Sequence, residues 1–91
     1  MHTENQIENY LKKQFEKIGA IVLKFTSPGT SGVPDRIIIL PTGETIYVEV
    51  KKKGGLVAPL QQYWIDKLRK QGADAFIVWS YEDVDKLLDI I

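Results

Sequence analysis

The chain has 91 residues, with 44% hydrophobic and 26% charged content, and equal numbers of basic and acidic residues give it a formal net charge of zero. These values are ordinary for a globular protein, so we expect one small domain over residues 1–91. The zero net charge excludes a strongly basic protein that coats nucleic acid, because such binding depends on phosphate neutralisation by Lys and Arg. The lack of Cys excludes a disulfide framework, a thiolate zinc site and a Cys nucleophile.

The sequence also lacks the signals of membrane insertion and export. No apolar run approaches the roughly 18 residues of a spanning helix, and Met1 to Asn5 do not resemble the start of a signal peptide. We therefore expect a soluble, cytoplasmic chain. A chain of this length buries only roughly 60% of its unfolded surface, so self-association would add stability, and we expect a homodimer.

The first third of the chain predicts a helix, a strand and a loop. Thr3 and Gln6 form a capping box before apolar residues at helical spacing, which predicts a helix from about Glu4 to Ile18. Ala20 to Phe25 is a short, apolar, β-branched run that indicates a strand. Thr26 to Pro34 is rich in Ser, Thr, Gly and Pro and is predicted to be a loop.

A β-hairpin is predicted next. Its strands run from Arg36 to Leu40 and from Glu44 to Val50, joined by the turn Pro41-Thr42-Gly43. The run Ile37-Ile38-Ile39 predicts a strand that is buried on both faces, as at the centre of a sheet.

The second half predicts the order loop, helix, strand and helix. Lys52 to Ala58 is the loop, and Pro59 opens a helix of about three turns that ends at Gly72. Ala75 to Trp79 is the fourth strand, and Tyr81 to Ile91 is the last helix. The connection between the third and fourth strands is long enough for a crossover, so we expect an α/β fold with a mixed sheet and helices packed on it.

The hairpin register determines which charged side chains meet. A three-residue turn with a left-handed Gly places Leu40 opposite Glu44, and counting back along both strands places Asp35 opposite Glu49. Opposed Cβ atoms lie about 4.5–5.5 Å apart, and like charges there are destabilising. Lys51 projects from the same face as Glu49. This arrangement calls for a cation, and it is typical of a metal-dependent nuclease.

Two motifs in this order of elements resemble the PD-(D/E)XK nuclease superfamily, and more narrowly a stand-alone, phage-type VRR-NUC domain. They are Gly32-Val33-Pro34-Asp35 before one strand and Glu49-Val50-Lys51 at the end of the next. The approach from Lys24 to Gly29 and Pro59-Leu60-Gln61 extend the resemblance over nearly the whole chain. It implies a restriction-endonuclease-like αβββαβ(α) core and a Mg²⁺- or Mn²⁺-dependent deoxyribonuclease. A departure is Ala58, where family members commonly have a capping Ser or Thr.

Chemical roles follow for the residues at the end of the hairpin. Asp35 and Glu49 are predicted to hold Mg²⁺ or Mn²⁺, because such ions typically bind through one or two carboxylates together with substrate phosphate. The resemblance implies the Val50 carbonyl as a further ligand. It also implies that Lys51 orients or helps deprotonate the attacking water. The alternative for Lys51 is a salt bridge to Glu49.

The resemblance implies two further site residues, which the residue pattern leaves open. Superfamily members often bring another acid from the first helix. Glu8 is favoured by its placement eleven residues before Gly19, while Glu4 lies one turn earlier; the alternative is that they favour the positive helix N-terminus. Gln61 resembles a glutamine that forms a hydrogen bond near the catalytic centre, and the alternative is a solvent-facing side chain.

Hydroxyl and basic residues around the hairpin end are candidate phosphate contacts that would position DNA without reading bases. They are Lys24, Ser27, Thr30, Ser31, Arg36, Lys52 and Lys53. No recognition helix or zinc finger is present, so we expect selectivity for DNA structure, such as a Holliday junction, flap or other branched DNA in replication, repair or recombination. Paired sites in a homodimer would match a four-way junction, as in related resolvases; monomeric action on flaps or nicks is the other option.

Two non-enzymatic alternatives remain at this point. One is a catalytically silent DNA-binding or assembly module that retains the nuclease fold, and the other is a structural interaction domain. The acidic pair argues against both, because a binder has no need of costly negative charge facing a polyanion. If the chain is phage-encoded, its place of action is the cytoplasm of the bacterial host.

Overall fold

A computed structural model describes residues 1–91, and it contains the seven elements in the order that the sequence predicts. They are α1 (Glu4–Lys17), β1 (Ile21–Lys24), β2 (Arg36–Ile39), β3 (Thr45–Val50), α2 (Pro59–Lys70), β4 (Asp74–Val78) and α3 (Tyr81–Asp89). The ends differ from the predicted ones by one or two residues, as is usual for fraying termini. The prediction of element order and type is therefore confirmed.

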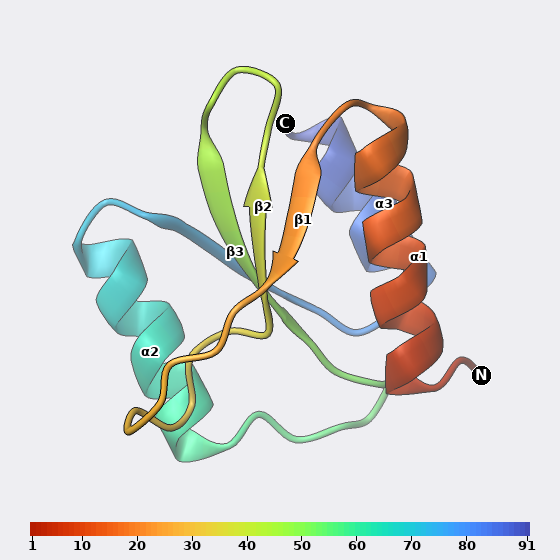
Figure 1. Cartoon of the computed structure of the whole chain (residues 1–91). Helices are drawn as coiled ribbons and strands as arrows, with labels where there is room; N and C mark the ends of the chain where they lie inside the picture. The colour runs from red at the N-terminus through yellow and green to blue at the C-terminus, as the bar shows by residue number, and fades with distance from the viewer.

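The strands form one mixed sheet in the order β1-β2-β3-β4. The β1–β2 and β2–β3 pairs are antiparallel, whereas β3 and β4 are parallel and are joined through α2. Figure 1 shows α1 and α3 on one side of the sheet and α2 on the other. The expected α/β architecture, with helices flanking a mixed sheet, is confirmed.

Local side-chain bonds define where the helices begin. The predicted capping box of α1 is present, since Thr3 N–H donates to Gln6 Oε1 at 2.9 Å and Gln6 N–H donates to Thr3 Oγ1 at 3.1 Å. Ser80 caps α3 by accepting from Asp83 N–H at 3.0 Å. None of the three helices combines the length and apolar character needed to cross a membrane.

The hydrophobic core lies between the sheet and the pair α1 and α3. Every second strand residue faces these helices, because strand side chains alternate between the two faces. The core consists of Ile7, Leu11, Phe15, Ala20, Val22, Ile38, Leu40, Ile46, Val48, Val50, Val78, Val84 and Leu87. It runs under α1 to the end of β3, so the last residues of β3 are held rigidly.

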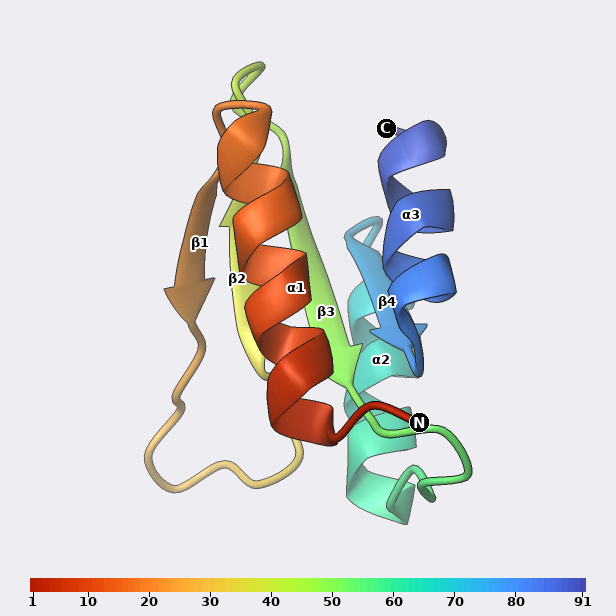
Figure 2. The same cartoon turned by 90° about the vertical axis from the view of Figure 1, so that its right-hand side faces the viewer.

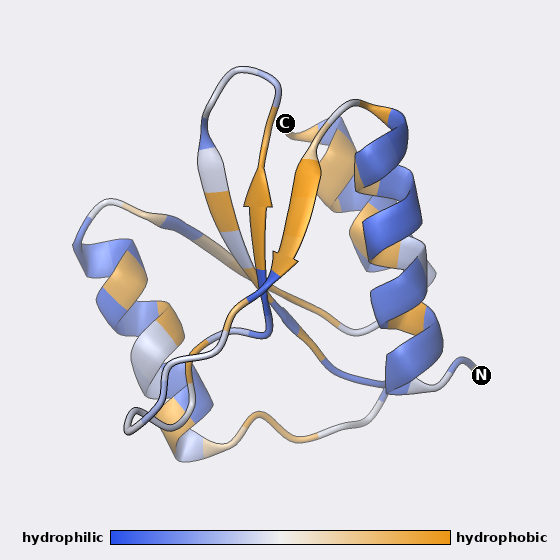
Figure 3. Cartoon of the chain, in the orientation of Figure 1, coloured by the Kyte–Doolittle hydropathy of each residue, from blue (hydrophilic) through white to orange (hydrophobic).

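The opposite face of the sheet is only partly covered. The expectation that Ile37, Ile38 and Ile39 are buried on both faces is wrong, because Ile38 alone is buried while its two neighbours are half-buried. Figure 2 shows the reason, as α2 lies behind β4 and leaves β1 and β2 without a helix on that side. Ile21 and Leu23 of β1 are 56% and 47% exposed. Figure 3 shows this apolar character on β1 and β2.

Candidate active site

The hairpin has the predicted register. Gly43 adopts a left-handed φ of 90°, and Leu40 N–H donates to Glu44 O at 2.8 Å. The pairs of β2 and β3 continue this register to the ends of both strands, which places Asp35 opposite Glu49. Asp35 is one of the groups that raise the pKa of Glu49, so the two carboxyl groups lie close to each other.

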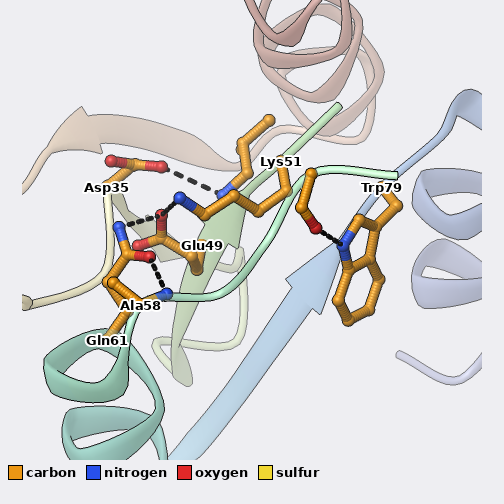
Figure 4. Close-up of polar contacts among 8 residues, drawn as sticks. Asp35, Glu49, Lys51, Ala58, Gln61 and Trp79 are labelled. Atoms are coloured by element: carbon orange, nitrogen blue, oxygen red, sulfur yellow. Dashed lines mark hydrogen bonds and ion pairs between the residues drawn. The ribbon is translucent and has the colours of Figure 1, made fainter. Parts of the chain in front are cut away.

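Glu49 is the single buried charged residue of the structure, with 1% of its surface exposed. Its Oε2 accepts from Gln61 Nε2 at 3.2 Å and lies 3.8 Å from Lys51 Nζ, whereas its Oε1 is buried without any partner. Figure 4 shows these side chains converging on Glu49. Burial, and then the facing Asp35, raises the pKa of Glu49 to about 8, and Lys51 only partly opposes this.

A proline shapes the other half of the site. Continued two residues beyond its last pair, Arg36 and Val48, the β2–β3 register would place Pro34 opposite Val50, where two residues normally exchange backbone hydrogen bonds. Pro34 has no N–H to give to the Val50 carbonyl, and the Val50 N–H itself donates to Asp35 Oδ2 at 3.0 Å. The proline thus leaves a carbonyl oxygen beside the two acids. This role of Pro34 was not predicted, although the sequence shows a proline here and proline has no backbone N–H.

These groups suit a hard divalent cation. Two carboxylates and a backbone carbonyl are oxygen donors of the kind that Mg²⁺ and Mn²⁺ prefer. The partnerless Glu49 Oε1 supplies a lone pair that nothing in the protein uses. No group of three or more His, Cys, Asp or Glu side chains gathers closely enough to hold an ion. A metal here would therefore rely on Asp35, Glu49, Val50, water and substrate.

The two acids of α1 have different surroundings. Glu8, which the spacing to the helix end favours as a third acid, instead holds Arg36, with Oε1 at 2.8 Å from Nε. This pair was not predicted, and it also engages a side chain expected to contact phosphate. Glu4 is exposed, but its charge contributes to the raised pKa of Glu49. Glu8 is thus engaged by Arg36 while Glu4 forms no ion pair, and the role of either at the site remains a prediction.

Gln61 connects α2 to the buried acid. Its Nε2 donates to Glu49, and its Oε1 accepts from Ala58 N–H at 2.9 Å. The alternative of a solvent-facing Gln61 is therefore wrong. The second bond also explains how α2 begins at Pro59 although Ala58 has no side-chain cap. One side chain thus defines the helix start and orients Glu49.

The loop before Asp35 is shaped by Gly32. This glycine has a φ of +92°, and a Cβ there would lie 2.7 Å from the carbonyl carbon and oxygen of Leu60. Only glycine permits both the backbone conformation and this close approach. The Gly32 contact thus places the loop against the first turn of α2, next to Gln61.

Two loops and one strand end carry the predicted phosphate contacts. Lys24 ends β1, Ser27, Thr30 and Ser31 lie in the loop between β1 and β2, and Lys52 and Lys53 lie in the loop before α2. Lys24, Ser31, Lys52 and Lys53 are exposed, while Ser27 and Thr30 are half-buried. Both loops lie at the end of the sheet where β3 delivers Glu49 (Figure 1).

Comparisons with known proteins agree with this geometry. The VRR-NUC domain model matches residues 2–81. "Putative nuclease p44" of Acyrthosiphon pisum secondary endosymbiont phage 1 is 48% identical over 88 residues, which cover 97% of this chain and 94% of that protein. A solved VRR-NUC domain has a TM-score of 0.89 at 37% identity, with 97% of both chains covered. A second, described as a VRR-NUC domain protein, has a TM-score of 0.75 at 16% identity over 97% of this chain and 86% of its own, and supports the fold alone.

The fold and the family match define a nuclease domain with a restriction-endonuclease-like fold. The chain belongs to the VRR-NUC family.

The raised pKa of Glu49 predicts an unusual pH dependence of stability. Between its ordinary pKa of 4.5 and about 8, the folded chain keeps a proton that the unfolded chain releases. The free energy of unfolding of the metal-free protein should therefore fall as the pH rises through this window, by roughly 3–5 kcal/mol. Urea unfolding in chelator, at pH values near both ends of the window, measures this fall.

Glu49→Gln is the matched control, because it keeps the shape and the hydrogen bond to Gln61 but cannot ionise. We expect its unfolding free energy to change little across the same pH window and to exceed that of the parent at the alkaline end. A variant that loses stability as steeply as the parent would show that another group titrates.

A pair of glycine variants tests the contact between the loop and α2. Gly32→Ala should lower the free energy of unfolding by more than about 2 kcal/mol, since it adds a clash with the Leu60 backbone to an unfavourable φ. Gly29→Ala is the control in the same loop, with a similar φ of +81° and nothing within 4 Å of an added Cβ. It should cost about 1 kcal/mol. Equal losses in urea unfolding would show that the contact contributes nothing.

Proposed function

We propose that this chain is a Mg²⁺- or Mn²⁺-dependent endonuclease of the PD-(D/E)XK superfamily that hydrolyses DNA phosphodiester bonds, with a preference for branched DNA. The observation that carries the proposal is the buried, partnerless Oε1 of Glu49 facing the carboxylate of Asp35. A buried carboxylate oxygen without a partner is costly, and such groups concentrate at functional sites. A silent binding module would have no use for it.

The metal-binding part of the proposal assigns three groups. Asp35 and Glu49 would hold the ion through their carboxylates, and Val50 would hold it through its backbone carbonyl, to which Pro34 has no N–H to donate. When bound, such an ion lowers the pKa of a water ligand and stabilises negative charge at the scissile phosphate. Val50 N–H keeps the Asp35 carboxylate oriented toward this position.

Lys51 and Gln61 complete the chemistry. The Lys51 N–H donates to Val78 O at 2.9 Å, which fixes the backbone and aims the side chain at Glu49, 3.8 Å away. In the proposed reaction, its ammonium leaves Glu49, orients the attacking water and offsets the charge that grows on the phosphate oxygens. Gln61 maintains the orientation of Glu49 Oε2 while Lys51 is engaged elsewhere.

Substrate binding is proposed to depend on backbone phosphates rather than bases. The exposed Lys24, Lys52 and Lys53 lie on the two loops and the strand end that surround the site, in a chain whose net charge is zero. Arg36 joins them when a phosphate replaces Glu8 as its partner, which would also free Glu8. Local basic groups of this kind position a duplex without reading its sequence.

The homodimer belongs to the same proposal. The face of β1 and β2 that α2 leaves open carries Ile21 and Leu23 beside the half-buried Ile37 and Ile39. Exposed apolar patches of this kind mark interaction sites. A second copy on this face would cover it and would present two active sites to one branched molecule, since two-fold pairing is the commonest arrangement.

Cleavage by site variants tests the nuclease. Asp35→Asn, Glu49→Gln and Lys51→Met should each lower the rate of cutting labelled branched DNA at least about a hundredfold, because each removes a charge that acts on the reacting phosphate. Glu44→Gln, at an exposed acid of the hairpin turn, should cut at the parent rate. Chelator should stop all cutting, and Mg²⁺ or Mn²⁺ should restore it. A parent that binds DNA but never cuts it would identify a silent binding module instead.

The dimer has its own test. Light scattering should give the parent twice the mass of one 10.4 kDa chain. The double variant Ile21→Glu, Leu23→Glu should give one chain mass, because it places charges in the proposed interface. It should still cut flaps but should lose paired cutting of four-way junctions. Ile90→Glu, at an apolar residue 69% exposed on the far side of the sheet, is the control and should remain dimeric. A monomeric parent would remove the paired-site proposal.

A further inference from the structure

One apolar side chain stands out in the loop between β3 and α2. Leu56 is 88% exposed, the highest value of any large apolar residue after Met1. A single exposed leucine is ordinary by itself. What distinguishes this one is the way its loop is held and where the loop lies.

The segment from Lys51 to Gln61, which contains this loop and the first turn of α2, contacts the buried Glu49 at both of its ends. At one end Lys51 Nζ lies 3.8 Å from Glu49 Oε2, and at the other Gln61 Nε2 donates to the same oxygen at 3.2 Å. Leu56 is midway between Lys51 and Gln61 along the chain. Five residues span at most roughly 17 Å, so the backbone of Leu56 lies within about five base-pair steps of the backbone of Lys51.

The backbone on both sides of Leu56 is fixed. Gly55 N–H closes a turn on Lys52 O at 2.8 Å, and the Trp79 indole Nε1 donates to Gly55 O at 3.4 Å, as Figure 4 shows. On the other side, Ala58 N–H is held by Gln61. A side chain displayed on a fixed backbone loses little conformational entropy when it binds, which favours a binding role.

The neighbouring charges indicate the kind of partner. Lys51, Lys52 and Lys53 immediately precede the Gly54-Gly55 turn that leads to Leu56. The centre of a protein interface is normally depleted of Lys, so a triplet of them next to an apolar anchor fits a protein partner poorly. It fits DNA, where lysines hold the phosphate backbone and a leucine enters between two bases.

We propose that Leu56 is a wedge that separates stacked bases close to the cut phosphate, with Lys52 and Lys53 on the backbone beside it. This inference rests on the proposed nuclease function and concerns its specificity. Separating bases is easiest where the stack is already interrupted. Leu56 therefore makes the enzyme prefer branch points, without reading any base.

Fluorescence of a base analogue tests the wedge independently of cutting. The assay uses the Glu49→Gln variant, for which we expect little or no cutting, and four-way and flap DNA that carries 2-aminopurine at the branch point. Binding of the Glu49→Gln protein should raise the fluorescence of 2-aminopurine, because this base analogue is brighter when it is unstacked. Adding Leu56→Ala or Leu56→Gln to this variant should abolish the rise in fluorescence and weaken binding to branched DNA about tenfold relative to single-stranded DNA. Adding Leu56→Met should leave the rise in fluorescence and the affinity for branched DNA unchanged.

A matched variant and light scattering distinguish a base wedge from a contact between copies of the chain. Ile90→Ala also shortens a well-exposed apolar side chain, and it should match its parent in every assay. Equal fluorescence for Leu56→Ala and its parent would overturn the wedge. A Leu56→Ala chain that becomes monomeric in light scattering without losing the fluorescence rise would also overturn it, in favour of a contact between copies. Failure of the parent to cut any DNA would instead count against the nuclease, which this binding assay does not require.

Discussion

The enforced closeness of Asp35 and Glu49 is the constraint on which the rest of the site depends. A left-handed Gly43 sets the hairpin register, and the register places two carboxyl groups across from each other. The energetic cost is greatest for Glu49, because its side chain is buried on the face of the sheet where Gln61 of α2 contacts it. The fold holds this acid with a pKa of about 8, because burial and the facing Asp35 both disfavour its charged form.

Several weaker interactions hold Asp35 and Glu49 in position. Pro34 has no backbone N–H to donate, and the Val50 N–H donates to Asp35 Oδ2 at 3.0 Å. Gln61 joins the start of α2 to Glu49, so the helix and the acid cannot move independently. The close approach of Gly32 to the Leu60 backbone packs the loop between β1 and β2 against the first turn of α2. Stability is thus lost at one end of the sheet, and the packing of α1 and α3 on the other elements offsets it.

The order of elements and the hairpin register were predictable because they depend on neighbours along the chain. Capping residues, glycines and periodic apolar residues act over a few positions, and the Thr3–Gln6 box and the Gly43 turn formed as expected. The burial of Ile37 and Ile39 was not predictable. It depends on how far α2 reaches across the sheet, and three consecutive isoleucines carry no information about that reach.

By itself, the sequence determined the type and order of the elements, the facing of Asp35 and Glu49, and the family resemblance, because each is encoded in local spacing. Only the tertiary structure decided that Arg36 engages Glu8, that Gln61 bonds to Glu49, and that one Glu49 oxygen has no partner. These outcomes depend on distances between elements far apart along the chain. Such distances arise from packing, which no local pattern specifies.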